Sequence, residues 1–599
     1  MSFLLCNYPQ IILPPLFFLF LSFSNIELVN KLEHVLKSKG VKQTWLCEQL
    51  GKSYNTVNNY VKNRNQPSLI VLKEIAILLK VDIEDLINFP SIGKPLKDEL
   101  SEFHEKNVSH EIRKKLGQFY THQELVKYIY SKIPISKESK ILDPTVGAGA
   151  FLIGSNKVNP KNLFGVDIDS IALDLCKQNV VSHFNEIQES NFVCGNTLNF
   201  NLNDIFPKVA QSGGFDIIIG NPPFQSLKSK IDFNPDNPVF FSFINGVVNS
   251  CTLIIAQSLN YLKENGYLGF VLPKNVLRVD SFQALRNQIS QNCTLIEIVD
   301  LGHYFNDVRG DQIVILLKKT KPKNYNNSVL IGIRKKGDEL NNISSYFLKQ
   351  KFLLNVSYFP IYRHQELLNV AEKLDKISLK LGERCEIFRG LNISSGNSLI
   401  SKESLSTNDI IIYRGDSIKK FGIKYNLYLA DEELVKEKNK INRLKRNKVI
   451  LQNLCSKEGG ITATFSSDLE LNIDTVTNVI PFDDSCFYIL GLINSNFSNF
   501  YLLNIVFLSS NFSLHTDSHY LGKIPFVIPT KKLESKVIEI TQQLMTLNGE
   551  RTEQYITLFK ELNSLIYKIY ELSSTEIKII ENSLIETLSK KQYYGTTNE

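Results

Sequence analysis

The pattern of apolar and polar positions changes three times along the chain. Between residues 26 and 89 the apolar positions recur with a helical period in short segments broken by turns. Between about residues 117 and 325, short apolar runs alternate with helical stretches, which is typical of a parallel sheet covered by helices on both faces. Short strands and turns begin at about residue 377, and amphipathic helices occupy about residues 533 to 589. The pattern predicts a multidomain protein with an all-α domain, an α/β domain of Rossmann-like type, and a mixed α+β domain with C-terminal helices.

The same changes set the predicted domain boundaries. An apolar leader covers residues 1–25, the helical domain covers 26–92, and a charged linker helix covers 93–116. The α/β domain covers 117–325, a connection 326–376, the mixed domain 377–530 and a C-terminal helical segment 531–599. The leader lacks a basic flank and a small-residue cleavage site, and its apolar run is short for a membrane span. We expect a mis-assigned start or an unstructured extension, with an export signal as the alternative, and whether the native protein contains these residues stays open.

Composition adds little to this division. The chain has 599 residues, of which 43% are hydrophobic and 22% charged, as expected for a globular protein with several cores. The net charge of +7 permits a polyanionic partner without requiring one. The nine cysteines form no CxxC pair and the histidines do not cluster, so no metal site or disulfide framework is readable. We expect a cytoplasmic protein with no metal and no membrane partner.

The helical domain contains two short helices separated by a turn. Gln43 lies on the first helix, Gly51 marks the turn, and Ser53 is a plausible N-cap of the second helix. The second helix carries Tyr54, Asn55 and Asn58 on its polar side, and a closing helix spans residues 69–79. This stretch resembles the phage-repressor (Cro-like) helix-turn-helix family, whose second helix enters the major groove of DNA.

That resemblance implies specific DNA contacts. Base edges would be read by Ser53, Tyr54, Asn55 and Asn58, and Gln43 would lie near a phosphate. A small helical bundle that binds proteins is the alternative. Whether such a domain would regulate transcription or help to dock the substrate stays open.

The α/β domain contains two strand ends suited to a ligand. The predicted strand at residues 141–142 runs into Asp143 and a turn with Gly147 and Gly149, where glycine lets the backbone approach a ligand closely. No third glycine follows at the spacing of the dinucleotide fingerprint, which argues against a pyrophosphate ligand. A second strand, residues 163–166, ends on Asp167, which is well placed to accept hydrogen bonds from ribose hydroxyls. The alternative role for Asp167 is a helix cap.

A later buried strand, residues 215–219, stops on the turn Gly220-Asn221-Pro222-Pro223-Phe224. Two prolines cannot extend a central strand, because neither donates a backbone hydrogen bond and both fix φ. The turn presents an amide side chain, stiffened carbonyls and an aromatic ring at the edge where open α/β sheets bind ligands. These groups suit a flat ligand that bears an NH2 group.

Read together, these motifs resemble one family. Residues 117–122, GQFYTH, precede the sheet, Asn196 follows a third strand, and Asn221 begins the proline turn. In this order they resemble the adenine-N6 DNA methyltransferases of restriction-modification systems, in the class with a C-terminal target-recognition domain. The resemblance is close over about residues 105 to 325 and looser from 377, where it rests on residues 387–390, 491–495 and 523–525.

The resemblance implies S-adenosylmethionine as the methyl donor and assigns residues to it. The methionine end would meet Thr121 and the turn formed by Asp143, Pro144, Thr145 and Val146. Asp167 would hold the ribose, Asn196 the donor's adenine, and Pro223 would lie beside that ring. Two positions depart from the usual pattern: His122 stands where proline is common, and Asn196 stands where aspartate is common. An amide can still serve the adenine edge, because it both donates and accepts.

For the target base, the resemblance implies a flipped adenine. The Asn221 side-chain oxygen and the Pro222 carbonyl would each accept one N–H of its amine, and Phe224 would stack on its ring. Phe305 is the expected second wall of the base pocket, with Tyr304 in reserve. Ordinary core packing is the alternative for both aromatics.

A basic run in the mixed domain completes the candidate surfaces. We expect Arg443, Lys445 and Arg446, within a run from Lys436 to Lys448, to contact DNA phosphates; a solvated helix face is the alternative.

Duplex DNA is the expected partner, and the resemblance allows a separate restriction endonuclease. Two other functions stay open: a transcription regulator with a degenerate methyltransferase domain, and an amide methyltransferase that acts on protein. The target sequence and the oligomeric state cannot be read from the chain.

Overall fold

The computed structural model describes most of the chain from residue 30 onward. The described residues are 30–63, 67, 69–81, 86, 121–227, 232–244, 247–305, 310–354, 356–394, 399–404, 406–407, 409–430, 435, 437–510, 514–589 and 592–593. The predicted leader at 1–25 and the linker helix at 93–116 lie outside them. The chain divides into two compact units, residues 1–271 and 272–599.

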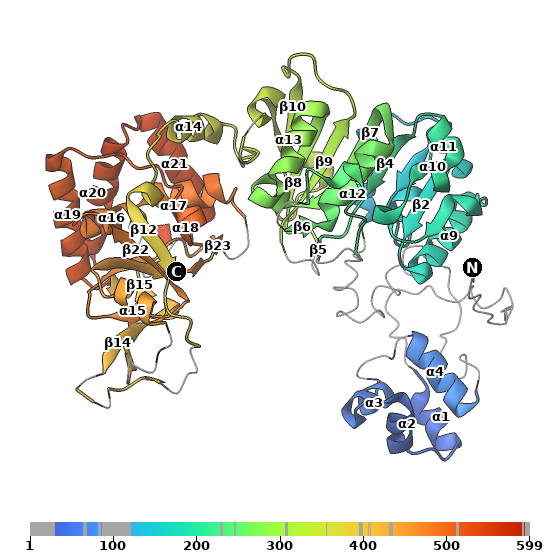
Figure 1. Ribbon diagram of the computed structural model, residues 1–599, viewed down its shortest axis with the longest axis horizontal. Helices are drawn as coiled ribbons and strands as arrows, with labels where there is room; N and C mark the ends of the chain where they lie inside the picture. Colours follow the sequence, from blue (N-terminus) through green and yellow to red (C-terminus); the bar gives the residue numbers. More distant parts are fainter. Residues whose placement is uncertain are drawn as a thin grey trace. The chain divides into compact units, whose positions relative to one another are not determined.

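The N-terminal helices form the predicted arrangement. They are α1 Leu32–Ser38, α2 Gln43–Leu50, α3 Tyr54–Val61 and α4 Leu69–Leu79, around a shared apolar core (Figure 1). Gly51 ends α2 with φ of +61°, a left-handed conformation that glycine adopts without strain. The Ser53 hydroxyl accepts the Thr56 N–H at 3.2 Å and caps α3. The predicted cap and the predicted closing helix are both confirmed.

The central feature of the chain is a nine-stranded sheet. Strands of the first unit run in the order β7-β4-β1-β2-β3 and are parallel to one another. Their bounds are β1 Ile141–Asp143, β2 Leu163–Asp167, β3 Phe192–Cys194, β4 Phe215–Gly220 and β7 Leu262–Pro273. The strand order reverses between β1 and β4, so their carboxyl ends flank a topological switch point, where open sheets bind ligands.

In the second unit, four strands run in the order β11-β10-β8-β9. They are β8 Thr294–Gly302, β9 Gln312–Lys318, β10 Ser328–Ile333 and β11 Ser344–Lys349. The expectation of a wholly parallel sheet is wrong here, because β8 pairs antiparallel with β9 and β10 pairs antiparallel with β11. The connection from Gly302 to Gln312 is too short for a crossover helix, so the chain must turn back. Strands β10 and β11 come from the stretch expected to be a connection.

The helices of the α/β region follow the strands in alternation. They are α7 Gln123–Ser131, α8 Ala150–Ile153, α9 Ser170–Phe184, α12 Ser250–Tyr261 and α13 Gln283–Asn292 (Figure 1). Helix α9 packs on β2 and β3, and α12 is buried along nearly its whole length. Their positions fix the turns that follow β1, β2 and β4.

The C-terminal half contains two small sheets. One has the order β12-β22-β18-β20, with β12 Cys385–Arg389, β22 Val476–Pro481, β18 Lys448–Gln452 and β20 Ala463–Ser466. The other has the order β13-β17-β14-β21, with β13 Ile400–Ser401, β17 Leu427–Leu429, β14 Ile410–Tyr413 and β21 Leu471–Asn472. The second sheet, together with α15 Lys438–Leu444, encloses an apolar core of its own. We call the part formed by β13, β17, β14, β21 and α15, with the loops that pack on this core, the β14 lobe.

Helices close the C-terminal half. They are α16 Cys486–Asn494, α17 Asn496–Phe500, α18 Ser518–Leu521, α19 Lys531–Thr546, α20 Glu553–Ile569 and α21 Ser574–Thr587, and the last three confirm the predicted amphipathic helices. The Asn494 amide pairs with both the N–H and the carbonyl of Ala463, at 3.1 and 2.9 Å, and ties α16 to β20. A Cβ at Gly491 would lie 2.5 Å from the Thr541 hydroxyl, so this glycine lets α16 and α19 approach closely. Among the described helices, none is long and apolar enough to cross a membrane.

Candidate active site and DNA-binding surfaces

The turn after β1 is held in place by hydrogen bonds of Asp143 and Pro144. Asp143 is 2% exposed, and its Oδ1 accepts the Thr145 N–H at 3.0 Å. Burial raises the pKa of Asp143 to about 8, against the opposing effect of that hydrogen bond. The Thr197 hydroxyl donates to the Pro144 carbonyl at 2.5 Å. A Cβ at Gly220 would lie 2.6 Å from Asp143 Oδ1, so the end of β4 packs directly against this carboxyl group.

Asp167, at the end of β2, joins two turns. Its carboxylate accepts the Gly147 N–H at 2.7 Å and the Asp169 N–H at 2.9 Å. Burial raises its pKa, and the backbone hydrogen bonds act in the opposite direction. The alternative that Asp167 caps the next helix is wrong, because Asp169 accepts the Ile171 N–H at 2.9 Å and caps α9. Gly147 has φ of +51° and open space where a Cβ would be, so the turn exposes backbone to a ligand.

Asn221 follows β4 and has an unmatched acceptor. Its Nδ2 donates to the hydroxyl of Thr121, a residue only 4% exposed, at 3.4 Å. Its Oδ1 is buried and receives no hydrogen bond from any described residue. Leaving a buried acceptor unsatisfied costs about 1–3 kcal/mol. An N–H group of a ligand placed at this oxygen would remove that cost.

The proline turn is held in place by Ser250, the first residue of α12. The Ser250 hydroxyl donates to the Pro223 carbonyl at 2.5 Å and accepts the Gln225 N–H at 2.9 Å. The Ser250 N–H donates in turn to the Gln225 carbonyl at 2.8 Å. No described residue donates to the Pro222 carbonyl. Two acceptors with unused capacity, on Asn221 and Pro222, therefore sit on a fixed turn beside the half-buried Phe224.

Comparison with known proteins identifies the domain that carries this site. Residues 97–365 match the model of the family described as N-6 DNA methylase, and residues 31–91 match the Cro/C1-type helix-turn-helix DNA-binding domain. Residues 97–365 belong to the N-6 DNA methylases. This domain is that of an S-adenosylmethionine-dependent, adenine-specific DNA methyltransferase of the kind found in restriction-modification systems.

Relatives of the methylase domain come from several bacteria. The type II methyltransferase M.VspI of a Vibrio species is 23% identical over 327 residues, which are 54% of this chain and 76% of that protein. The type II methyltransferase M.HincII of Haemophilus influenzae is 26% identical over 227 residues, which are 37% of this chain and 40% of that protein. Among solved structures, the restriction-modification enzyme MmeI bound to DNA matches with a TM-score of 0.51 at 13% sequence identity. The match covers 87% of this chain and 78% of the MmeI chain, and it shows a shared fold.

Two predicted site residues of the methylase have partners of their own. Asn196 accepts the Leu198 N–H at 3.0 Å and donates to the Asp232 carbonyl at 2.7 Å, so its amide is already fixed at the end of β3. Phe305, in the second unit, is 4% exposed and packs edge-on against Tyr304. The roles of Asn196 at the donor's adenine and of Phe305 at the target base stay predictions.

The polar side of α3 faces solvent. Val57 and Val61 are buried on its inner side, whereas Asn55 is exposed and Tyr54 is 56% exposed. Asn58 is half-buried. The Ser53 hydroxyl is occupied by the cap, and Gln43 begins α2 with a buried Oε1 that accepts no hydrogen bond from the described residues. The helix that would enter the groove presents an aromatic and amide side chains.

The basic run at α15 is not a uniform positive face. Arg443 pairs with Glu386 at 2.6 Å and lies over the Phe388 ring at 3.9 Å from its centroid. Arg446 reaches the same carboxylate at 3.4 Å, whereas Lys445 is exposed. A phosphate at Arg443 or Arg446 would compete with Glu386, so phosphate contact at these residues stays a prediction.

The last lysine of the run is structural. Lys448 is fully buried in β18, and its ammonium donates to the carbonyls of Ser467 and Glu470 at 2.6 and 2.8 Å. Burial lowers its pKa to about 8. The expectation of a surface lysine is wrong at this position, and Lys436 lies outside the described residues.

Ser250 was not singled out from the sequence, and its effect can be measured. In Ser250→Ala the Pro223 carbonyl and the Gln225 N–H both lose their partner. We expect kcat for methyl transfer to fall about tenfold, because each lost hydrogen bond is worth about 1 kcal/mol, with donor affinity unchanged. Ser250→Thr retains the hydroxyl and should recover most of the rate. Ser190→Ala, at an exposed serine, is the control. An unchanged kcat in Ser250→Ala would show that the turn is rigid without this residue.

Proposed function

We propose that the chain transfers a methyl group from S-adenosylmethionine to the N6 amine of an adenine flipped out of duplex DNA. The observation that carries this proposal is Asn221 Oδ1, a buried acceptor with no partner among the described residues, at the switch point of the sheet. An adenine amine has two N–H bonds to donate. Asn221 Oδ1 and the Pro222 carbonyl offer one acceptor for each.

The chemistry follows from these two acceptors. An exocyclic amine is a weak nucleophile, because its lone pair is delocalised into the ring. Two hydrogen bonds from its N–H groups draw the nitrogen toward tetrahedral geometry, so the lone pair becomes available for the new N–C bond. The S–CH3 bond of the donor would break with its electron pair left on sulfur, and the methylated nitrogen would then lose one N–H proton to solvent. The residues therefore contribute placement and electrostatics, and no strong base is needed at the turn. Phe224 offers a face on which the flipped ring can stack.

The turns after β1 and β2 fit the methyl donor. S-adenosylmethionine, when bound, supplies an electrophilic methyl group. Thr145 has a buried hydroxyl with no partner among the described residues, and Gly147 leaves backbone open beside it. Asp143 and Thr121 would face the methionine end and Asp167 the ribose, where its carboxylate retains lone pairs beyond those used by Gly147 and Asp169.

The remaining regions are proposed to bind DNA. Residues 377–530 would recognise the target sequence, and α3 would present Tyr54, Asn55 and Asn58 to a major groove. We place the enzyme in the cytoplasm, where the genomic DNA lies, with a separate restriction endonuclease as its partner in the system. A regulator with an inactive methylase domain is disfavoured, because Asn221, Asp143 and Asp167 are all in place.

Expression in a host free of DNA methylation tests the reaction. We expect sequencing of the genome to show one short motif whose adenine is methylated at nearly every copy. A genome without modified adenine would overturn the proposal.

Deletion of residues 26–92 separates two possible roles of the helix-turn-helix domain. Retained methylation would indicate that the domain regulates transcription, whereas loss of methylation would indicate that it helps to dock the DNA substrate.

A further inference from the structure

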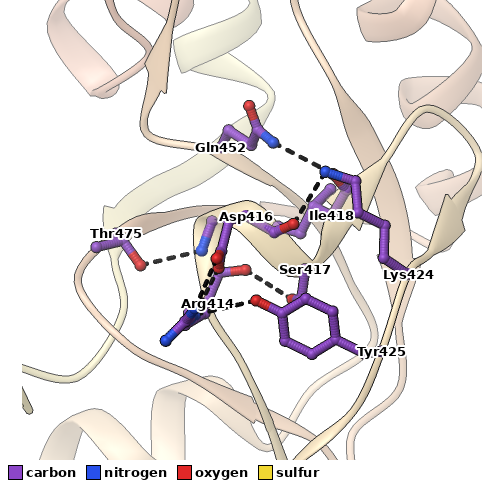
Figure 2. Close-up of polar contacts among 9 residues, drawn as sticks. Arg414, Asp416, Ser417, Ile418, Lys424, Tyr425, Gln452 and Thr475 are labelled. Carbon is purple, nitrogen blue, oxygen red and sulfur yellow. Dashed lines mark hydrogen bonds and ion pairs between the residues drawn. The ribbon is translucent and has the colours of Figure 1, made fainter. Parts of the chain in front are cut away.

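A pre-oriented arginine lies at the loop after β14. Arg414 donates from Nε and Nη2 to the two carboxylate oxygens of Asp416, both at 2.6 Å, and Nε also donates to the Tyr425 hydroxyl at 3.1 Å. Figure 2 shows dashed lines from the guanidinium to both of these side chains. One edge of the guanidinium, Nε and Nη2, is thus used within the loop.

The loop that carries Arg414 is itself fixed at several points. The Gly415 N–H donates to the Thr475 hydroxyl at 3.0 Å, and the Ser417 hydroxyl donates to the Arg414 carbonyl at 2.7 Å. The Lys424 ammonium donates to the Asp416 carbonyl at 3.0 Å (Figure 2). A Cβ at Gly415 would lie 2.7 Å from the Thr475 carbonyl, so only glycine fits there. The position of the arginine is therefore set by hydrogen bonds within its loop and by the contact of that loop with Thr475.

The contribution of the Arg414–Asp416 pair to folding stability is too small to explain why this side chain is held so firmly. The Arg414 side chain is 35% exposed and that of Asp416 58%, and exposed ion pairs of this kind contribute little to folding. The pair instead fixes the orientation of the guanidinium. Among the described residues, none accepts a hydrogen bond from Nη1, so the edge formed by Nη1 and Nη2 points away from Asp416 with donors to spare.

We propose that this edge of Arg414 reads a guanine in the major groove of the methylation target. Two parallel N–H donors match the O6 and N7 acceptors of guanine, which no other base presents together. A phosphate is disfavoured, because the Asp416 carboxylate beside the guanidinium would repel an anion, whereas a base edge is neutral. Holding the guanidinium in advance removes the entropy cost of ordering a long side chain. This inference rests on the proposed methylation of duplex DNA.

The test compares methylated motifs in a host free of methylation. The wild type should methylate a motif that contains an obligatory guanine. In Arg414→Ala, discrimination at that one position should relax by about tenfold to a hundredfold, while the adenine and the other positions stay unchanged. Arg414→Lys keeps the positive charge but lacks the two parallel N–H donors, so discrimination between bases should relax at the same position. Arg384→Ala is a matched control, because Arg384 is 37% exposed and also pairs with an aspartate, Asp483, at 2.6 Å.

Two outcomes would overturn the inference. An unchanged motif in both Arg414 variants would show that the arginine does not read the sequence. Weakening at every position alike, with a shallower salt dependence and rescue by lysine, would indicate a phosphate contact. If the wild type methylates nothing, the proposed function fails on its own. Selection of bound duplexes from a random pool with the same variants then decides the role of Arg414 without methyl transfer.

Discussion

Asn221→Ala is expected to lower kcat for methyl transfer by about a thousandfold, because preorganised hydrogen bonds to a reacting group are worth that much in a water-excluded site. The substitution removes a buried side-chain acceptor that has no partner among the described residues. The hydrogen bonds within the donor turn do not involve Asn221, whose side chain donates to the Thr121 hydroxyl at 3.4 Å. Donor affinity should therefore stay within about twofold of the wild type. Single-turnover transfer of labelled methyl to duplex DNA and calorimetric titration of the donor measure the two quantities.

Two variants sharpen this result. Asn221→Asp retains an acceptor at the same position and should retain part of the rate. Asn234→Ala removes an exposed asparagine from the loop that follows the proline turn and should have no effect. A fully active Asn221→Ala enzyme would remove the amine-holding role.

Asp167→Ala is expected to weaken donor binding by about a hundredfold. The change leaves the N–H groups of Gly147 and Asp169 without an acceptor, and each lost hydrogen bond costs about 1–2 kcal/mol of stability in the turn. It also removes the acceptor proposed for the ribose hydroxyls. Because these losses fall on the turn and not on the reacting amine, KM for the donor should rise more than kcat falls. Titration of the donor and steady-state kinetics over a range of donor concentrations measure this split.

The matched control is Asp174→Ala on α9. Asp174 is 69% exposed and pairs at 3.6 Å with Lys177, so its removal should not alter donor affinity. Equal donor affinity in Asp167→Ala and the wild type would contradict the assignment of Asp167. A loss of affinity in the control as well would point to a general effect of charge.

The sequence predicted the ends of strands better than the partners of side chains. Apolar runs located β1, β2, β3 and β4, and the two prolines marked the end of β4, because these signals are local. Whether Asp167 is a ligand residue or a helix cap stays open in the sequence, because the residue at which the next helix begins is not marked by a local pattern. The antiparallel return of β9 was also missed, because periodicity does not give strand direction.

Contacts between distant parts of the chain explain the other differences. Ser250 lies 25 residues from Gln225, and Glu386 lies 57 residues from Arg443. The pattern of residues within one segment does not indicate which distant side chain it will contact. The basic run looked uniform because charge is visible in the sequence, whereas the burial of Lys448 between strands is not.

The separate apolar core of the β14 lobe has an evolutionary consequence. Its ten buried apolar residues pack among themselves, from Leu391 to Ile473. Strands β18 and β20 lie between these residues in sequence but belong to the other sheet, so the consequence concerns substitutions that line this interior, which can change without altering the hydrogen bonds of the donor turn or the proline turn. If the lobe reads the target sequence as proposed, new recognition sequences can arise by substitution within it alone, with the methylation chemistry inherited unchanged.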